Sequence, residues 1–400
     1  MEPVAWMIIF IYLAISRTLH TATAHALCND TCQLPDCFCR YADRPSSHPL
    51  AATPQMVLVT YTGPITKETR AGISDIFPDR IRNPVHDCPM GVTLFAVAAD
   101  TNDCAAHLLY VRGHEIALGG LTEQQTRNAS AKTWLRDVKR QRHDLSNRSY
   151  IPESHIRGFR APLLRPGGDE QFEAIYDHGF LYDSSLVAEP LSEDADISRP
   201  WPFTLDIPYD SMFRCQAGGK CPKHSYPAFW EVPATGLVTD WRSCAFIDNC
   251  LTTMRSSEDV FRWLYRNYRA HRDGNRAPMQ INLRASTLRN KMAAEGLKMF
   301  VKVLANDAHN DTWVLTTQEA LDWVRSPVAL ADIGHTGMWS CNEHRRYHSC
   351  YMDVNQRTKK TINTFRLYLD VDRIWYWQII ALVIGYIALK RYERVKYGND

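Results

Sequence analysis

The stretch Pro54-Gln-Met-Val-Leu-Val-Thr-Tyr-Thr-Gly63 decides which fold this chain of 400 residues adopts. Its centre, residues 56–59, is a continuous apolar run, and Pro54 and Gly63 bound the stretch. Such a run is typical of a strand buried on both faces, as in a parallel sheet or barrel. In these folds the chemistry lies where a strand ends and its loop begins. Here that point carries no acid, histidine or cysteine, only Thr60, Tyr61, Thr62 and Gly63.

Further apolar runs follow this strand and alternate with amphipathic stretches. The expected strands are Met56–Thr60, Val92–Val97, Glu115–Leu118, Gly158–Ala161, Leu181–Asp183, Ala228–Pro233 and Met279–Leu283. The expected helices are Cys104–Arg112, Ala131–Gln141, Val260–His271 and Leu288–Leu304. Repeated strand–helix units predict a parallel barrel or a doubly wound sheet over residues 54–327. Residues 187–227, which become rich in proline and cysteine, are expected to form a disulfide-pinned insertion.

The charge composition argues against a nucleic-acid partner. The formal net charge is +2 and charged residues make up 22% of the chain. No basic stripe with interleaved aromatic residues is visible, and both features are expected of a nucleic-acid-binding face. We therefore expect no nucleic-acid partner.

Several features indicate the secretory pathway. An apolar run, Val4–Ile15, precedes small residues suited to cleavage, so residues 1–26 are expected to be a signal peptide. The alternative is an uncleaved anchor, because the segment before the run carries Glu2 and no lysine or arginine. Twelve cysteines suit up to six disulfides in an oxidising compartment. Four sequons predict glycosylation, at Asn29, Asn128, Asn147 and Asn310.

Four of these cysteines, at positions 28, 32, 37 and 39, cluster in residues 27–53, an N-terminal segment that ends in a polar linker. Zinc is one interpretation of such a cluster. Disulfides are the other, and we favour them because no histidine stands nearby and the compartment is oxidising.

The chain beyond residue 327 changes in composition. Residues 328–373 are expected to form a cysteine loop and stalk, with Cys341 and Cys350 closing a loop that carries His344 and His348. The two histidines are either metal ligands or ordinary surface residues, and we favour the latter. Residues 374–389 form an apolar run followed by a basic tail, residues 390–400. A helix over this run spans roughly 24 Å of the ~30 Å hydrocarbon core.

This run is expected to cross a membrane once, with the basic tail on the cytoplasmic side and the preceding chain outside. A buried or amphipathic terminal helix is the alternative. We therefore expect a cell-surface protein of single-pass type I topology, or an extracellular one.

Several segments together resemble one family. They are Leu34-Pro-Asp-Cys-Phe-Cys39, Thr53-Pro-Gln-Met56, Asn102-Asp-Cys104, Arg112-Gly-His-Glu-Ile-Ala-Leu118, Gly158-Phe-Arg-Ala-Pro162, Gln171-Phe172, Asp177-His-Gly-Phe-Leu-Tyr-Asp-Ser-Ser185, Trp201-Pro-Phe-Thr-Leu-Asp206 and Ser225-Tyr-Pro-Ala-Phe-Trp-Glu-Val-Pro233. In order and spacing they resemble the secreted chitin deacetylases of the NodB-homology type, carbohydrate esterase family four, over about residues 28–325. The resemblance implies a distorted (β/α) barrel with a groove for a linear N-acetylglucosamine polymer.

The same resemblance shows that the catalytic positions are changed. Family members hydrolyse an acetamide with a divalent metal, such as zinc, held by one aspartate and two histidines. An aspartate base and a histidine acid complete the site. By position, the base is replaced by Thr62, the metal aspartate by Gly63, the metal histidines by Gly119 and Glu123, and the acid by Arg284. We therefore expect no metal and no cofactor. The alternative is an active deacetylase with relocated ligands.

The leading hypothesis is a catalytically inactive protein that binds a chitin-like or other glycan, or a protein partner. The groove is expected to be lined by Tyr61, Arg160, Pro162, Phe229 and Trp230. In the family the arginine equivalent to Arg160 contacts the base aspartate, which is absent here. A new partner for Arg160 is expected, either Glu123, Asp183 or an anionic ligand, because an unpaired buried charge costs several kcal/mol.

Overall fold

The computed structural model describes residues 32–40, 42–120, 129–188, 199–207, 215, 219–240, 242–307 and 309–341. Several predictions fall outside these residues. They are the signal peptide 1–26, the glycosylation sites Asn29 and Asn128, the position Glu123, the histidine-bearing loop 342–350 and the segments 374–389 and 390–400. Among the described helices, none is long and apolar enough to cross a bilayer.

The described chain is an α/β fold on a largely parallel sheet, as the sequence predicts. Along the sheet the strands follow the order β12-β1-β2-β3-β4-β5-β8-β7, with β13 also paired to β1. Only β7 runs antiparallel to its neighbour in this sheet. The strands are β1 Gln55–Gly63, β2 Thr93–Ala96, β3 Glu115–Leu118, β4 Gly158–Phe159, β5 Tyr182–Asp183, β7 Phe203–Leu205, β8 Tyr226–Glu231, β12 Met279–Leu283 and β13 Thr312–Leu315.

The strand β1, which lies within the apolar stretch 54–63, pairs with three other strands. One edge pairs with β12 over residues 57–61. The other edge pairs first with β13, over residues 55–58, and then with β2, over residues 60–63. Residues 55–61 are all buried, as expected of a strand covered on both faces. The chain later returns to the far edge, where Phe246 forms a parallel bridge to Asn282 of β12.

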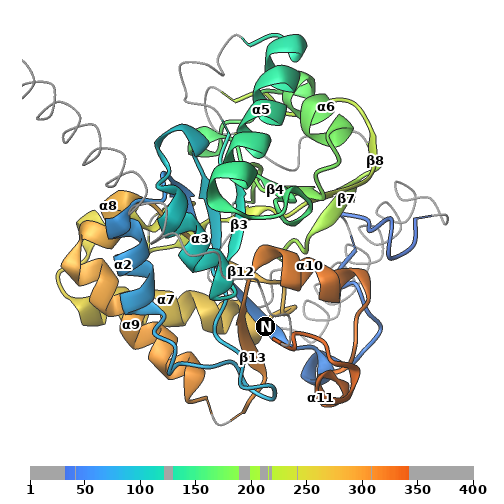
Figure 1. Ribbon diagram of the computed structural model, residues 1–400. Helices are drawn as coiled ribbons and strands as arrows, with labels where there is room; N and C mark the ends of the chain where they lie inside the picture. The colour runs from blue at the N-terminus through green and yellow to red at the C-terminus, as the bar shows by residue number, and fades with distance from the viewer. Residues whose placement is uncertain are drawn as a thin grey trace, which may run out of the picture. The chain divides into compact units, whose positions relative to one another are not determined.

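Helices cover the sheet in groups (Figure 1). In that view α2, α7, α8 and α9 lie together on one side and α5 and α6 lie at the top, while α10 packs against β1. The helices are α2 Lys67–Ile76, α3 Asp103–Val111, α5 Ala131–Ser149, α6 Asp169–Asp177, α7 Ser257–Arg272, α8 Ala285–Arg289, α9 Lys291–Ala305, α10 Thr317–Arg325 and α11 Ile333–Thr336. Polar residues fix their starts. Ser256 with Asp259, and Thr316 with Glu319, form capping boxes for α7 and α10.

Disulfides pin several loops. Those between described cysteines are Cys32–Cys37, Cys88–Cys341, Cys215–Cys221 and Cys244–Cys250. Cys39 is also disulfide-bonded. The disulfide interpretation of the N-terminal cluster is therefore confirmed for Cys32, Cys37 and Cys39. The expected loop closure between Cys341 and Cys350 is wrong, because Cys341 is bonded to Cys88, which lies 253 positions earlier in the chain.

Residues 328–341, which we assigned to a stalk, pack on the domain instead. Ile333 is fully buried, and the ring of Trp339 lies 5.2 Å from that of Trp313 in β13. The indole Nε1 of Trp339 donates to the carbonyl oxygen of Glu319 at 2.9 Å. Ile333 and Trp339 therefore anchor this segment in the hydrophobic core.

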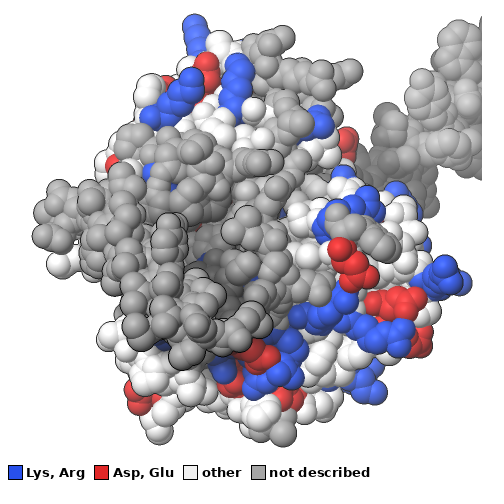
Figure 2. All heavy atoms as spheres, turned by 180° about the vertical axis from the view of Figure 1, so that it is seen from behind, with Lys and Arg blue, Asp and Glu red and all other residues white. Residues whose placement is uncertain are grey.

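The surface carries both signs of charge. On the face that Figure 2 shows, basic and acidic side chains of the described residues are intermixed. This arrangement agrees with the small net charge of the whole chain.

Candidate functional site

Arg160 is the centre of the polar site at the carboxyl ends of the strands. Its side chain is fully buried. Nη1 donates to Thr60 Oγ1 at 2.7 Å and to Thr62 Oγ1 at 3.3 Å. Nη2 donates to Ser184 Oγ at 2.8 Å and to Gln280 Oε1 at 3.0 Å, and Nε donates to the Ser184 carbonyl oxygen at 2.9 Å. All five N–H groups of the guanidinium are thus used, each on a neutral acceptor.

The charge of Arg160 is balanced without a direct carboxylate contact among these acceptors. Burial lowers the pKa of Arg160 to about 9, and the acidic groups of Tyr182, Asp183 and Glu231 act against this shift. The guanidinium carbon also lies 4.0 Å from the centroid of the Phe95 ring, a cation–π arrangement. Asp183, one of the partners expected from the sequence, therefore contributes by charge but accepts no hydrogen bond from Arg160.

The aromatic residues expected to line a groove are buried instead. Tyr61 is fully buried, and its hydroxyl donates to the Pro64 carbonyl oxygen at 2.9 Å. Phe229 is 2% exposed and Trp230 is 1% exposed. The prediction of these three as groove lining is wrong, because each side chain points into the core of the sheet rather than toward solvent. Pro162 is half-buried at the edge of the site.

The two glycines at the positions equivalent to the family's metal ligands are constrained in different ways. At Gly119, which follows β3, an added Cβ would lie 2.5 Å from the Phe95 carbonyl oxygen and 2.9 Å from its carbon. At Gly63 the backbone has φ +140°, a conformation that favours glycine. A side chain at either position would therefore need the backbone to move.

Arg284 stands at the former acid position, at the end of β12. It binds Asp248 through Nε at 3.1 Å and Nη2 at 2.7 Å, and it donates to Asn249 Oδ1 at 2.8 Å. Its guanidinium carbon lies 4.5 Å from the Phe246 ring centroid. Arg284 therefore has an internal partner that the sequence did not indicate.

The described residues at these strand ends do not fit the divalent metal that the family resemblance implies. Thr62 Oγ1 already accepts from a cation, and Gly63 and Gly119 have no side chain. Among the residues with described placement, no group of three His, Cys, Asp or Glu side chains could hold a metal ion. We therefore assign no metal-dependent step to this part of the chain.

Comparison with known sequences finds chitin deacetylases, the class of protein that the motifs resemble. No family model matches the chain. It is 29% identical over 359 residues to chitin deacetylase 1 of Bombyx mori, and the match covers 83% of this chain and 64% of the relative. It is 27% identical over 313 residues to chitin deacetylase 8 of Bombyx mori, with coverages of 75% and 78%. The chain is a chitin deacetylase-like protein of the NodB type.

Solved structures with similar folds are more distant from the chitin deacetylase-like chain. The crystal structure of a putative polysaccharide deacetylase from Mycobacterium smegmatis is 15% identical to this chain, with a TM-score of 0.46. It aligns with 71% of this chain and 94% of its own. The structure of Puue allantoinase has the same TM-score at 14% identity, covering 71% of this chain and 94% of its own. At these TM-scores we draw no functional argument from either structure.

Two buried carboxyl groups lie beside Arg160 in the chitin deacetylase-like chain. Asp183 of β5 and Glu231 of β8 are register partners, and both are fully buried. Asp183 accepts from the Ser185 amide at 2.7 Å, from the Ser185 hydroxyl at 2.9 Å and from Gln171 Nε2 at 3.2 Å. Burial raises the pKa of Asp183 to about 6 and raises that of Glu231 further above its usual value. The pair therefore holds one proton, carried by Glu231 and directed at Asp183.

Replacing Glu231 by glutamine should reduce the pH dependence of stability. Glu231 keeps its proton in the folded chain, whereas the unfolded chain releases it as the pH rises through 4.5, so the contribution is fully present below that pH. The contribution is lost as the pH rises from there through the raised pKa of Glu231. In Glu231→Gln an amide donor replaces the proton, so the decline in melting temperature from pH 4.5 to 7.5 should be smaller than in the unaltered protein. Asp240→Asn, at an exposed carboxylate, should behave as the unaltered protein does, and equal slopes in all three proteins would contradict this assignment.

Sequence reasoning missed Asp248 and the role of Glu231, because both acquire their partners only through the fold. Two histidines of the matched segments contact the backbone. His114 Nδ1 accepts from the Val92 amide at 3.2 Å, and His178 Nε2 lies 3.1 Å from the Leu135 carbonyl oxygen. The described sequon asparagines, Asn147 and Asn310, are both exposed, and their glycosylation stays a prediction.

Proposed function

We propose that this chitin deacetylase-like protein is catalytically inactive and acts by binding, as an extracellular or cell-surface module for a chitin-type glycan. One observation carries this proposal: the former catalytic positions that the structure describes are engaged in internal contacts or have no side chain. Thr62 accepts from Arg160, Arg284 is paired with Asp248, and Gly119 has no space for a Cβ. None of these groups can ligate a metal, abstract a proton or donate one near neutral pH.

The glycan part of the proposal is supported by the relatives. Both Bombyx mori proteins are named chitin deacetylases, and the chain spans 64% of the first and 78% of the second. The described disulfides are typical of an extracellular compartment. A binding surface would involve exposed residues, because the aromatic side chains of β1 and β8 are buried. A protein partner is the second candidate, and membrane attachment through residues 374–389 is part of the proposed cell-surface location.

Purified protein should release no acetate from N-acetylglucosamine oligomers and should contain no stoichiometric zinc. Chitin deacetylase 8 of Bombyx mori serves as the comparison enzyme in the same acetate assay. Elemental analysis of the two proteins, prepared identically, gives the metal ratio. A zinc-to-protein ratio near one that is lost in Glu123→Ala, together with acetate release, would instead establish the active deacetylase with relocated ligands.

Binding is measured in parallel on chitin, chitosan and cellulose beads. Retention on chitin with little on cellulose is the expected result. Equal retention on all three materials, or none, would contradict the glycan proposal and leave the protein partner as the better candidate. The catalytic conclusion rests on the acetate and zinc measurements and is independent of this result.

A further inference from the structure

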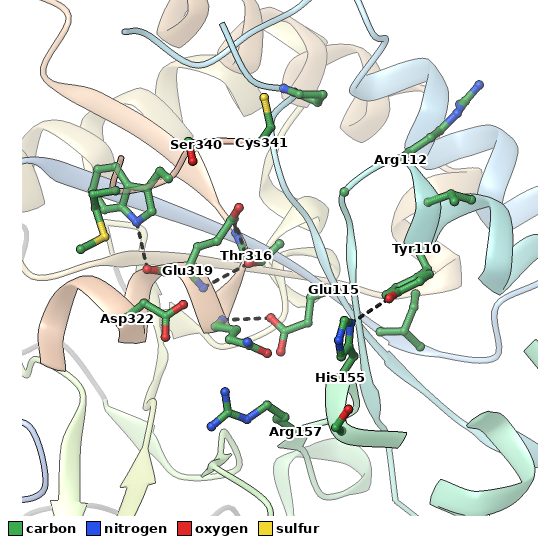
Figure 3. A pocket seen from close by; sticks show the side chains of 18 of the residues that line it. Tyr110, Arg112, Glu115, His155, Arg157, Thr316, Glu319, Asp322, Ser340 and Cys341 are labelled. Atoms are coloured by element: carbon green, nitrogen blue, oxygen red, sulfur yellow. Dashed lines mark hydrogen bonds between the residues drawn. The ribbon is translucent and has the colours of Figure 1, made fainter. Parts of the chain in front are cut away.

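A large pocket lies beside Arg157, which precedes β4, whereas Arg160 follows that strand (Figure 3). It has a volume of about 920 Å³ and is lined where β3 begins, at Glu115, and where α10 begins, at Thr316. Small-molecule sites in proteins typically enclose roughly 300–1,000 Å³. The pocket is therefore large enough for a ligand of one or two sugar rings. Sequence analysis could not predict this pocket, because its walls come from segments that are distant along the chain.

One wall of this pocket is fixed by the C-terminal segment. Met338, Trp339 and Cys341 line the pocket, and Cys341 is tied to Cys88 by a disulfide. Trp339 is held by its hydrogen bond to the Glu319 carbonyl oxygen and by its contact with Trp313. The wall is therefore part of the packed domain, which gives the pocket a defined shape.

Arg157 is the distinctive side chain of the pocket. Its guanidinium is half-buried and extends into the pocket in Figure 3. Within the described part of the chain it makes no hydrogen bond and no ion pair, whereas Arg160 uses all five of its donors. Arg112 also lines the pocket, but its guanidinium points away in Figure 3, donating to Ser74 Oγ at 2.9 Å and lying 3.9 Å from Asp79. A half-buried guanidinium without a partner favours an anionic ligand group.

The opposite side of the pocket carries acceptors. Asp322 and Glu319 of α10 line the side away from His155 (Figure 3), and Glu319 Oε2 also accepts from the Thr316 amide at 2.8 Å. A compact dianion such as sulfate would be repelled by these carboxylates. A ligand that carries one anion toward Arg157 and hydroxyl groups toward Asp322 would be complementary to both sides. We propose that this pocket is a binding site for a sugar acid, with Arg157 as the anchor of its carboxylate.

Calorimetric titration of the full chain with glucuronate, glucose and inorganic sulfate tests this site. Glucuronate should bind at least tenfold more tightly than glucose or sulfate. Arg157→Gln should weaken glucuronate binding at least tenfold. Arg157→Lys, which keeps the charge but loses bidentate geometry, should have an intermediate effect. Arg112→Gln is the matched control, because it removes a pocket arginine that points away, and it should change the affinity less than twofold.

The result on the unaltered chain alone can overturn the proposal, so it does not depend on every variant folding. Glucose or sulfate binding as tightly as glucuronate would show that the pocket does not recognise a sugar acid. Equal losses in Arg157→Gln and Arg112→Gln, with both variants folded by circular dichroism, would show that Arg157 is not the anchor. The site is independent of the proposed function, because its residues lie at the other end of the strands.

Discussion

Replacing Arg160 by methionine is expected to lower the free energy of unfolding by about 3–5 kcal/mol. Methionine has a similar length, so the change leaves little cavity and mainly removes the hydrogen-bonding group. Thr60 Oγ1, Ser184 Oγ and the Gln280 Oε1 atom would then lose a donor inside the core. The buried carboxyl groups around the site would also lose their cation. Chemical denaturation followed by tryptophan fluorescence measures the change.

Arg284→Met provides the matched control for this prediction. The Arg284 side chain is 28% exposed and is bound to Asp248 at the surface of the site. Partly exposed ion pairs of this kind contribute roughly 1 kcal/mol or less. If Arg160→Met were as stable as Arg284→Met but failed to bind chitin, Arg160 would be a binding residue rather than the centre of a structural network.

The strands whose sequence is continuously apolar could be predicted closely. The bounds of β3 and β12 coincide with the expected runs, and β1 extends the expected run at both ends. The strand β13 was missed, although it pairs with β1. Its four residues follow a polar turn, and nothing local distinguishes so short a run from a loop. Its assignment depends on the long-range pairing with residues 55–58.

That catalysis is lost stays a prediction, but the positions equivalent to the family's catalytic residues could be assigned from motif order and spacing. Their present contacts could not. Arg284 and Asp248 lie 36 positions apart in the sequence. An arginine and an aspartate at that separation do not by themselves predict an ion pair. The aromatic residues were misassigned for a related reason. An aromatic residue at a strand end suits both a sugar-binding face and a core, and only the packing around Tyr61 and Trp230 distinguishes them.

Arg160 binds neutral acceptors instead of the aspartate that its equivalent contacts in the family. The family aspartate is replaced by Thr62, and the charge is accommodated by neutral acceptors at short range and by carboxyl groups at longer range. No ligand is needed to satisfy this arginine. Arg157, at the other end of the sheet, is the arginine that we expect to bind a ligand. Its guanidinium has no partner within the described part of the chain.

Substitution of Gly119 is expected to destabilise the fold strongly, by about 3 kcal/mol or more for Gly119→Ala. The added Cβ would lie 2.5 Å from the Phe95 carbonyl oxygen, a backbone atom that cannot rotate away. Relief would require β2 and β3 to separate, at the cost of the pairing between Phe95 and Ala117. Gly119→His, which would restore the residue type of the active family, should be at least as unstable and should bind no zinc.

Gly72→Ala is the matched control, because its Cβ would meet only the Leu288 side chain, at 3.5 Å. Gly72 lies inside α2, where alanine is favoured over glycine by roughly 0.5–1 kcal/mol, so this variant should be as stable as the unaltered protein or more so. Denaturation midpoints of Gly119→Ala, Gly119→His and Gly72→Ala measure the change in stability. Elemental analysis measures their zinc content. A folded Gly119→His protein with unaltered stability and one bound zinc would show that the backbone after β3 can accept a ligand. In that case the proposed loss of catalysis would follow from the changed side chains alone, whereas the expected result would mean that the backbone after β3 also fails to accommodate a metal ligand.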